Sequence, residues 1–380
     1  MGTQSTKIDV NLNSLGEKLT AKQLLMLVFA VKLVGVAFAT LVFARFSPLI
    51  DSELYLKGFY YIDPHFRTLA IQWMASAPNR LGGAYVAHIT FALISVVGLT
   101  YYFLTGGRRW ILIVPLLLPS SLVWTSIVGK EAVFFGSMAL SLVVWSKYTV
   151  KPLEWVDVAV ATVAFGVCAE LRPHYAISIG WLFVSTTLLK RRNHNAAGII
   201  LVLLFIVGVV ATYLTVWQEL LYRGYGAIEH TARASRHQAL GILPGNSEGF
   251  MLGFEQFKSN IPLAIFFGIV GPFPSEALKR LELLPFFLEG VLILIFPLFV
   301  ALWVKKHKLP KNREFFRIFW WCLMPAILIL MVLHAPFGLL NPGSATRWRT
   351  NFEQIFYLAP LLLMFRFTDD APTENHSFPP

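Results

Sequence analysis

The sequence predicts an all-α, polytopic membrane protein that crosses a bilayer about ten times. Hydrophobic residues make up 56% of the 380 residues and charged residues only 14%, a balance that is not expected of a water-soluble globule. Apolar stretches near the roughly 20 residues needed for a spanning helix also recur along the chain. Short basic turns or longer polar segments separate them. The lipid bilayer is therefore the expected solvent for most of the chain.

The apolar stretches define the elements in order. The ten expected spans cover residues 22–45, 83–105, 110–127, 131–147, 155–171, 175–189, 197–219, 284–304, 314–334 and 351–366. Pro115 and Pro119 predict a kink or a short helix in the third span. Residues 1–21 lack the apolar core and cleavage site of a signal peptide, so we expect a cytoplasmic lead-in there. One transmembrane domain, 22–367, and a cytoplasmic tail, 368–380, complete the expected organisation.

The net charge of +11 raises the question of nucleic-acid binding, and the placement of the basic residues argues against it. Many of them lie at short turns between spans, the pattern that marks cytoplasmic turns. These residues are Arg108, Arg109, Lys147, Lys151, Lys190, Arg191, Arg192, Lys305, Lys306, Lys308, Lys311 and Arg313. The long polar segments 47–82, 220–283 and 335–350 then fall on the opposite, external side.

Three segments are too short or too polar to span. Residues 52–62 and 65–77 mix aromatic, aliphatic and charged side chains, and they are predicted to be interfacial helices with a break at Asp63-Pro64. Residues 260–274 are about half a span long before Gly-Pro and Pro punctuation, which favours a re-entrant or interfacial segment.

Acidic residues near two external turns are candidates for chemistry. Asp51 directly follows the first span, where partial desolvation suits a carboxylate to act as a general base; capping of the following helix is the structural alternative. Lys130 and Glu131 begin the fourth span and point in different directions as neighbours on a helix. They are therefore not expected to pair with each other, which leaves one of them free to meet a partner from another loop; a structural ion pair at the helix start is the alternative.

Arginines at two further external turns are candidates for binding phosphate. Arg172 and His174 lie in the turn between the fifth and sixth spans, and Arg347 and Arg349 precede the last span. Guanidinium groups offer planar, bidentate donors that stay charged in a low-dielectric cleft. Snorkelling to lipid headgroups is the alternative interpretation.

The loop 220–283 is the expected acceptor-binding cover. Its candidate residues are Arg223, Tyr225, His230, Arg233 and Arg236, although long loops translocate largely regardless of their charge.

Other features restrict the chemistry. The spacing of the histidines does not define a metal site, so a divalent cation is possible but unsupported. The sequence contains neither a Walker motif nor a G-x-G-x-x-G motif, so an ATP-driven activity is not expected. Cys168 and Cys322 lie in apolar stretches, where packing is the simplest interpretation. Lys32 stands in the middle of the first span and is expected to pair with Asp157 or Glu154, or to reach a cavity.

Several short strings, taken in order, resemble the GT-C superfamily of integral-membrane glycosyltransferases, which includes protein O-mannosyltransferases and aminoarabinose transferases. IDSELYLKGFYY places Asp51 at the position of the acidic residue in the family's first external loop. PSSLVWTSIVGKE, LRPHYA, GPFPSE and GSATRWRTNFEQIFYLAPLL are similar to later turns of the family. Relatives have two adjacent acidic residues at this point, whereas here Glu53 stands two residues after Asp51. Glu53 is therefore a second candidate for the base.

The resemblance implies inverting transfer of a sugar from a polyprenyl-phosphate or polyprenyl-diphosphate donor to a glycan, lipid or protein acceptor. The expected location is the outer face of a bacterial inner membrane, in cell-surface polysaccharide synthesis. Asp51 would act as the base, and Lys130, Glu131, Arg172, His174, Arg347 and Arg349 would form the donor site. A Wzy-like polysaccharide polymerase, a transporter or flippase of lipid-linked substrates, and a non-enzymatic scaffold are the alternatives.

Overall fold

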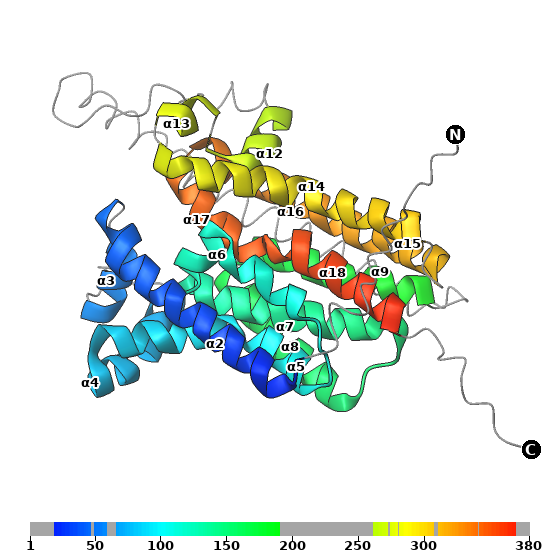
Figure 1. Ribbon diagram of the computed structural model, residues 1–380, viewed down its shortest axis with the longest axis horizontal. Coiled ribbons are helices and arrows are strands. Elements are labelled where there is room, and N and C mark those ends of the chain that lie inside the picture. Colours follow the sequence, from blue (N-terminus) through cyan, green and yellow to red (C-terminus); the bar gives the residue numbers. More distant parts are fainter. Residues whose placement is uncertain are drawn as a thin grey trace, which may run out of the picture.

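The computed structural model describes residues 19–46, 49–58, 66–190, 261–272, 274–279, 281–307, 311–340 and 342–369. Within these ranges every regular element is a helix, as predicted, and the longer helices form one elongated bundle (Figure 1). The expected span 197–219 lies outside the described residues.

The N-terminal half supplies one side of the bundle. Its helices are α2 (Ala21–Ala37), α3 (Ile50–Lys57), α4 (Phe66–Ser95), α5 (Val97–Leu104), α6 (Pro119–Trp124), α7 (Lys130–Val150), α8 (Trp155–Leu171) and α9 (Pro173–Lys190). A capping box starts α2: the Thr20 side chain accepts from the backbone N–H of Gln23, and the Gln23 side chain accepts from the backbone of Thr20. Short π and 3-10 segments continue α2 to Arg45.

The C-terminal half supplies the other side. It comprises α12 (Ile261–Val270), α13 (Pro274–Lys279), α14 (Leu284–His307), α15 (Asn312–Ile318), α16 (Met324–Leu340), α17 (Pro342–Phe352) and α18 (Gln354–Asp369). In Figure 1 α14, α15 and α16 form the upper layer, with α17 and α18 between this layer and α7.

Four helical stretches among the described residues are long and apolar enough to cross a membrane. They are Ala21–Arg45, Lys130–Val150, Leu281–His307 and Asn312–Ala335. A fifth is possible, because α4 and α5 together pass the same test although they are bent by 52°. The protein is therefore a multi-pass helical protein by composition and length. The described residues account for four or five of the ten expected spans by this test.

The differences from the expected spans have local physical causes. Residues 110–127 do not form one helix: a 3-10 segment, Trp110–Leu117, contains Pro115, and α6 starts afresh at Pro119, because proline cannot donate the backbone hydrogen bond of a continuous helix. Helix α3 ends at Gly58, which takes a left-handed conformation. The range of α4 contains two helices, because Gly82 and Gly83 take non-helical backbone conformations and form a kink. The predicted helix over 65–77 corresponds to the part before this kink, which begins at Phe66.

Helix α12 is ten residues long, too short to cross a bilayer in the usual way, and it packs against α14, α16 and α17.

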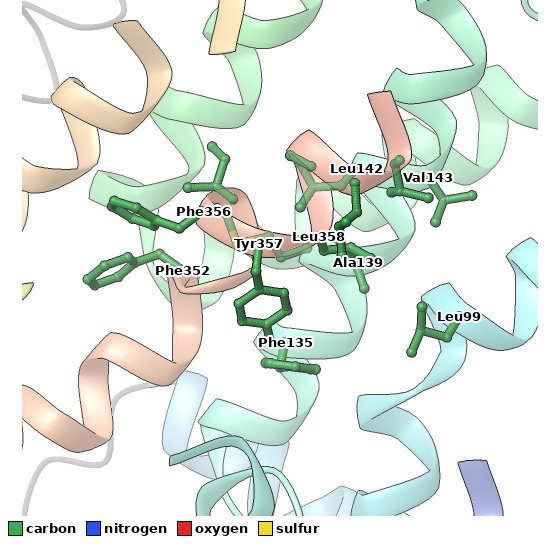
Figure 2. Packing of buried hydrophobic residues seen from close by; sticks show 14 of the residues in the cluster. Leu99, Phe135, Ala139, Leu142, Val143, Phe352, Phe356, Tyr357 and Leu358 are labelled. Carbon is green, nitrogen blue, oxygen red and sulfur yellow. The ribbon is translucent and has the colours of Figure 1, made fainter. Parts of the chain in front are cut away.

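Helix α7 is the centre of the bundle. Among the 18 most apolar consecutive residues of α7, 72% are buried, whereas the corresponding share is 33–50% in the other three long apolar stretches. Helix α7 packs against α4, α5, α8, α17 and α18. Figure 2 shows Phe135, Ala139, Leu142 and Val143 of α7 beside Tyr357 and Leu358 of α18. The core is thus built around α7, and the residues that begin this helix are held rigidly.

Glycine allows the close approach of α7 to its neighbours. A Cβ atom at Gly136 would overlap the carbonyl oxygen of Ile94, whereas a Cβ at Gly166 on α8 would meet nothing within 4 Å. We therefore expect Gly136→Ala to lower the free energy of unfolding by about 1–3 kcal/mol through overpacking. Gly166→Ala should be neutral or slightly stabilising. Thermal unfolding of the two variants in detergent checks this, and equal melting temperatures would contradict it.

Candidate active site

Four segments that are far apart in the sequence meet at one end of the bundle. They are α3, the first turn of α7, the junction of α8 with α9, and α17. Figure 1 places α3 and α17 toward the same end of the molecule. Each segment supplies one charged side chain: Asp51, Glu131, Arg172 and Arg347, respectively.

The four side chains form one chain of ion pairs, which we call the ionic quartet. The Arg347 guanidinium donates from Nε to Glu131 Oε1 and from Nη2 to Glu131 Oε2, both at 3.0 Å, while its Nη1 donates to Asp51 Oδ2. Arg172 Nη2 donates to Glu131 Oε1 at 3.1 Å. The order is Asp51, Arg347, Glu131, Arg172, and Arg347 uses its planar fork on two carboxylates at once.

Burial differs along the ionic quartet. The Glu131 side chain is only 2% exposed, Arg347 is 19% exposed, and Asp51 is 46% exposed. The Asp51 carboxylate therefore stands at the open end, and no described residue donates a hydrogen bond to its Oδ1. An incoming hydroxyl group can reach Asp51 more readily than Glu131.

A tryptophan ring packs against each of the two arginines of the quartet. The Arg347 guanidinium lies 5.3 Å from the centre of the Trp124 ring, and the Arg172 guanidinium lies 5.4 Å from that of Trp348. Such cation–π contacts stabilise a charge in a partly desolvated site.

Electrostatic effects set the protonation of two side chains. Burial alone would lower the pKa of Arg347, but the carboxylates of Glu131 and Asp51 outweigh it and raise the pKa above its ordinary value. Burial and the Glu131 carboxylate raise the pKa of Tyr55, on α3. Arg347 is therefore always charged, and Tyr55 offers a neutral hydroxyl. Sequence reasoning missed Tyr55, whose only signal was its position one helical turn after Asp51.

Two further cations lie beside the quartet, and one arginine of the quartet has a donor to spare. Lys130 donates to the neutral Thr68 hydroxyl, at 3.0 Å, and no hydrogen bond or ion pair joins Arg67 to another described residue. Two arginines, Arg67 and Arg172, and two carboxylates, Glu131 and Asp51, are within electrostatic reach of Lys130. The Nε atom of Arg172 is buried without a partner. We call Arg67, Lys130 and Arg172 the cationic cluster.

Counted together, the quartet and the cluster contain four cations, Arg67, Lys130, Arg172 and Arg347, and two carboxylates, Asp51 and Glu131. The excess of two positive charges fits an anionic ligand. Sequence reasoning did not single out Arg67, because nothing in the chain predicted that the start of α4 folds back on α7.

His174 is buried at the base of this region. Its ring packs 4.0 Å from that of Tyr175, whose hydroxyl lies 2.8 Å from His334 Nδ1. His174 thus packs in an aromatic layer next to the cationic cluster. It lies within electrostatic reach of Arg172.

Arg349 takes a different position from the one expected. Its side chain is 1% exposed, and it donates to the carbonyl oxygens of Ile269, Gly271 and Phe286 and pairs with Glu289 at 3.3 Å. All these contacts tie α17 to α12 and α14. The reason is geometric: residues two apart on a helix point in different directions, so Arg347 and Arg349 cannot serve one site.

The other predicted residues are not part of the quartet. Glu53 is 61% exposed and pairs with Lys57 at 3.1 Å on the surface of α3. Asp51 is not the cap of α3, because the cap position is Leu49 and the Asp51 side chain turns to Arg347. The expected acceptor residues Arg223, Tyr225, His230, Arg233 and Arg236 lie outside the described residues. Within the described ranges no group of three or more His, Cys, Asp or Glu side chains gathers.

Lys32 does not pair with Asp157 or Glu154. Asp157 is bound by Lys147 at 2.5 Å and by the Tyr101 hydroxyl at 2.8 Å, and Lys147 also lies 3.6 Å from Glu154. Lys32 is buried and donates to the Thr125 hydroxyl on α6. Ser121, one turn earlier on α6, donates to Glu353. These polar groups form a second network inside the bundle.

Comparisons with protein-family models, with curated proteins and with solved structures find no match for this chain.

Glu131 is expected to hold the ionic quartet together. Glu131→Gln leaves Arg172 and Arg347 buried without their shared carboxylate, so we expect the free energy of unfolding to fall by about 3–5 kcal/mol. Glu53→Gln is the matched control, because an exposed pair contributes at most about 1 kcal/mol. Thermal unfolding in detergent measures both. A Glu131→Gln protein as stable as the control would show that the quartet does not support this end of the bundle.

Proposed function

We propose that the protein is a membrane glycosyltransferase that moves a sugar from a polyprenyl-phosphate or polyprenyl-diphosphate donor to an acceptor outside the cytoplasm. The observation that carries the proposal is the contact between Arg347 and both Asp51 and Glu131. A half-exposed carboxylate next to an excess of arginine and lysine is what transfer from a phosphate leaving group requires. The ordered resemblance to GT-C strings supports the same reaction class.

The reaction uses the two parts of the site differently. Asp51 takes the proton from the acceptor hydroxyl, whose oxygen attacks the anomeric carbon of the donor sugar. The bond between that carbon and the phosphate oxygen breaks, and its electron pair stays on the phosphate. The configuration at the anomeric carbon is inverted in this single displacement.

The cationic cluster stabilises the leaving phosphate group in this proposal. When the sugar leaves a polyprenyl-phosphate donor, the phosphodiester becomes a phosphate monoester, and the negative charge on the phosphate group increases by one unit. Arg67, Lys130 and Arg172 carry donors that no described carboxylate uses fully, so they are free to stabilise this charge as it develops. Stabilisation that grows toward the transition state increases the rate of the chemical step.

A transporter of lipid-linked substrates is the second candidate, and one observation favours it. Lys32 lies in the middle of the first long apolar stretch, and Thr125, Ser121 and Glu353 extend its network through α6 to the start of α18. Buried polar side chains at this depth are typical of substrate or ion pathways. Flux in vesicles without sugar transfer would favour this candidate.

The base assignment predicts the effect of one substitution. Asp51→Asn keeps an oxygen for Arg347 but cannot accept a proton, so we expect transfer to fall by about 10²- to 10⁴-fold while the protein still accumulates in membranes. The measurement compares lipid-linked intermediates and surface glycans in a deletion strain that carries either form. Glu53→Gln is the control, since Glu53 lies outside the quartet. Full activity of Asp51→Asn would eliminate Asp51 as the base.

The cationic cluster predicts a second effect. Arg67→Gln and Lys130→Gln should each weaken binding of the anionic donor and reduce turnover by about 10-fold or more, because each removes one of the few charges near the leaving phosphate. Arg80→Gln is the matched control on α4, where the side chain is exposed. Initial rates at varied donor concentration measure the effect. A loss of the same size in all three variants would point to general surface charge instead.

A further inference from the structure

An apolar pocket lies at the opposite end of the bundle from the ionic quartet. Its volume is about 270 Å³, and it is lined by α14, α18 and the start of the 3-10 segment Trp110–Leu117. Phe296, Phe299 and Trp303 of α14 face Leu361, Met364 and Phe365 of α18 across it. This pocket takes no part in the proposed transfer reaction.

One charged side chain reaches the apolar pocket. Arg109 is part of its lining, next to Trp110, and the Arg109 guanidinium lies 5.1 Å from the centre of the Phe365 ring. The pocket therefore combines an apolar interior with a single cation at its rim. Such a combination matches an amphiphile with an anionic headgroup and one hydrocarbon chain.

The sequence position of the lining places the pocket near one membrane surface. Trp303 is followed by Lys305 and Lys306 at the end of α14, and Phe365 is followed by Arg366 near the end of α18. Two residues correspond to about 3 Å along a helix. The rim thus lies at the level of the basic turns, which the distribution of lysine and arginine assigns to the cytoplasmic leaflet. Tryptophan is also enriched at this depth.

We propose that this pocket binds one acyl chain of an anionic glycerophospholipid of the cytoplasmic leaflet, with the phosphate on Arg109. The acyl chain removes the aromatic and aliphatic lining from water and headgroups, and the phosphate pairs with a guanidinium that lies over an aromatic ring. Basic pockets between helices on the cytoplasmic side are suited to such headgroups. The bound lipid fills the space between α14, which holds Arg349 through Glu289, and α18, which directly follows α17.

Two tryptophans in the lining make the proposal measurable. Bromine atoms on an acyl chain quench tryptophan fluorescence on contact. The full chain is reconstituted in phosphatidylcholine vesicles that contain either phosphatidylglycerol or phosphatidylcholine brominated on the acyl chain. We expect the brominated anionic lipid to quench about fivefold more effectively at low mole fraction, the selectivity that one basic residue at a membrane surface provides. Trp110→Phe combined with Trp303→Phe should remove most of this difference.

Neighbouring arginines provide the matched pair of variants. Arg109→Gln is expected to bring the selectivity for the anionic lipid close to one. Arg108→Gln should keep most of it, because Arg108 does not line the pocket. If the tryptophan variants do not fold, the two arginine variants decide the matter with all eleven tryptophans in place.

Three results would overturn the proposal. Equal quenching by the two brominated lipids in the wild-type protein would show that the headgroup is not recognised. Equal loss of selectivity in the Arg108 and Arg109 variants would assign it to general surface charge. An unchanged lipid difference in the double tryptophan variant would show that the contact lies elsewhere, with another occupant in the pocket. None of these results depends on whether Asp51 is a catalytic base.

Discussion

The Arg347 guanidinium is the interaction on which this end of the molecule depends. It binds Glu131 through two parallel hydrogen bonds and Asp51 through a third donor, and thereby joins α17 to α7 and to the short helix α3. A carboxylate as deeply buried as Glu131 requires such a partner, because an unpaired charge in a low-dielectric interior costs several kcal/mol. Arginine suits this role since its planar group serves both carboxylates and stays ionised.

Helix α17 connects this site to the rest of the bundle. Arg347 faces the quartet, while Arg349, two residues later, is buried against α12 and α14. Gly290 makes room for this packing, because a Cβ atom there would lie 2.6 Å from Arg349 Nη1. The position of Arg347 is therefore set by contacts on the other face of its own helix. A site built in this way keeps its geometry without help from a loop.

Charges with and without a carboxylate partner lie side by side at this end of the bundle. The quartet contains two arginines and two carboxylates, whereas Lys130 and Arg67 form no ion pair with a described carboxylate. An uncompensated cation in a half-buried position is unfavourable in isolation, which supports the proposed role of these two residues in binding an anion. The basic residues at the opposite end of the bundle differ, because there they border an apolar pocket and the expected lipid surface.

The sequence by itself determined the class of protein and the residues able to do chemistry. Hydropathy is a local property of the sequence. It therefore reveals the four long apolar helices and the break at Pro119, and it makes charged residues next to apolar stretches stand out: Asp51, Glu131, Arg172 and Arg347. Only the tertiary structure decided which charges meet. It joined Arg347 to Asp51 across 296 residues, turned Arg349 away, left Glu53 at the surface and brought in Arg67 and Tyr55. The physical reason is that a side chain's partner depends on helix rotation and packing, which hydrophobic periodicity does not specify in a bundle that is apolar on nearly all sides.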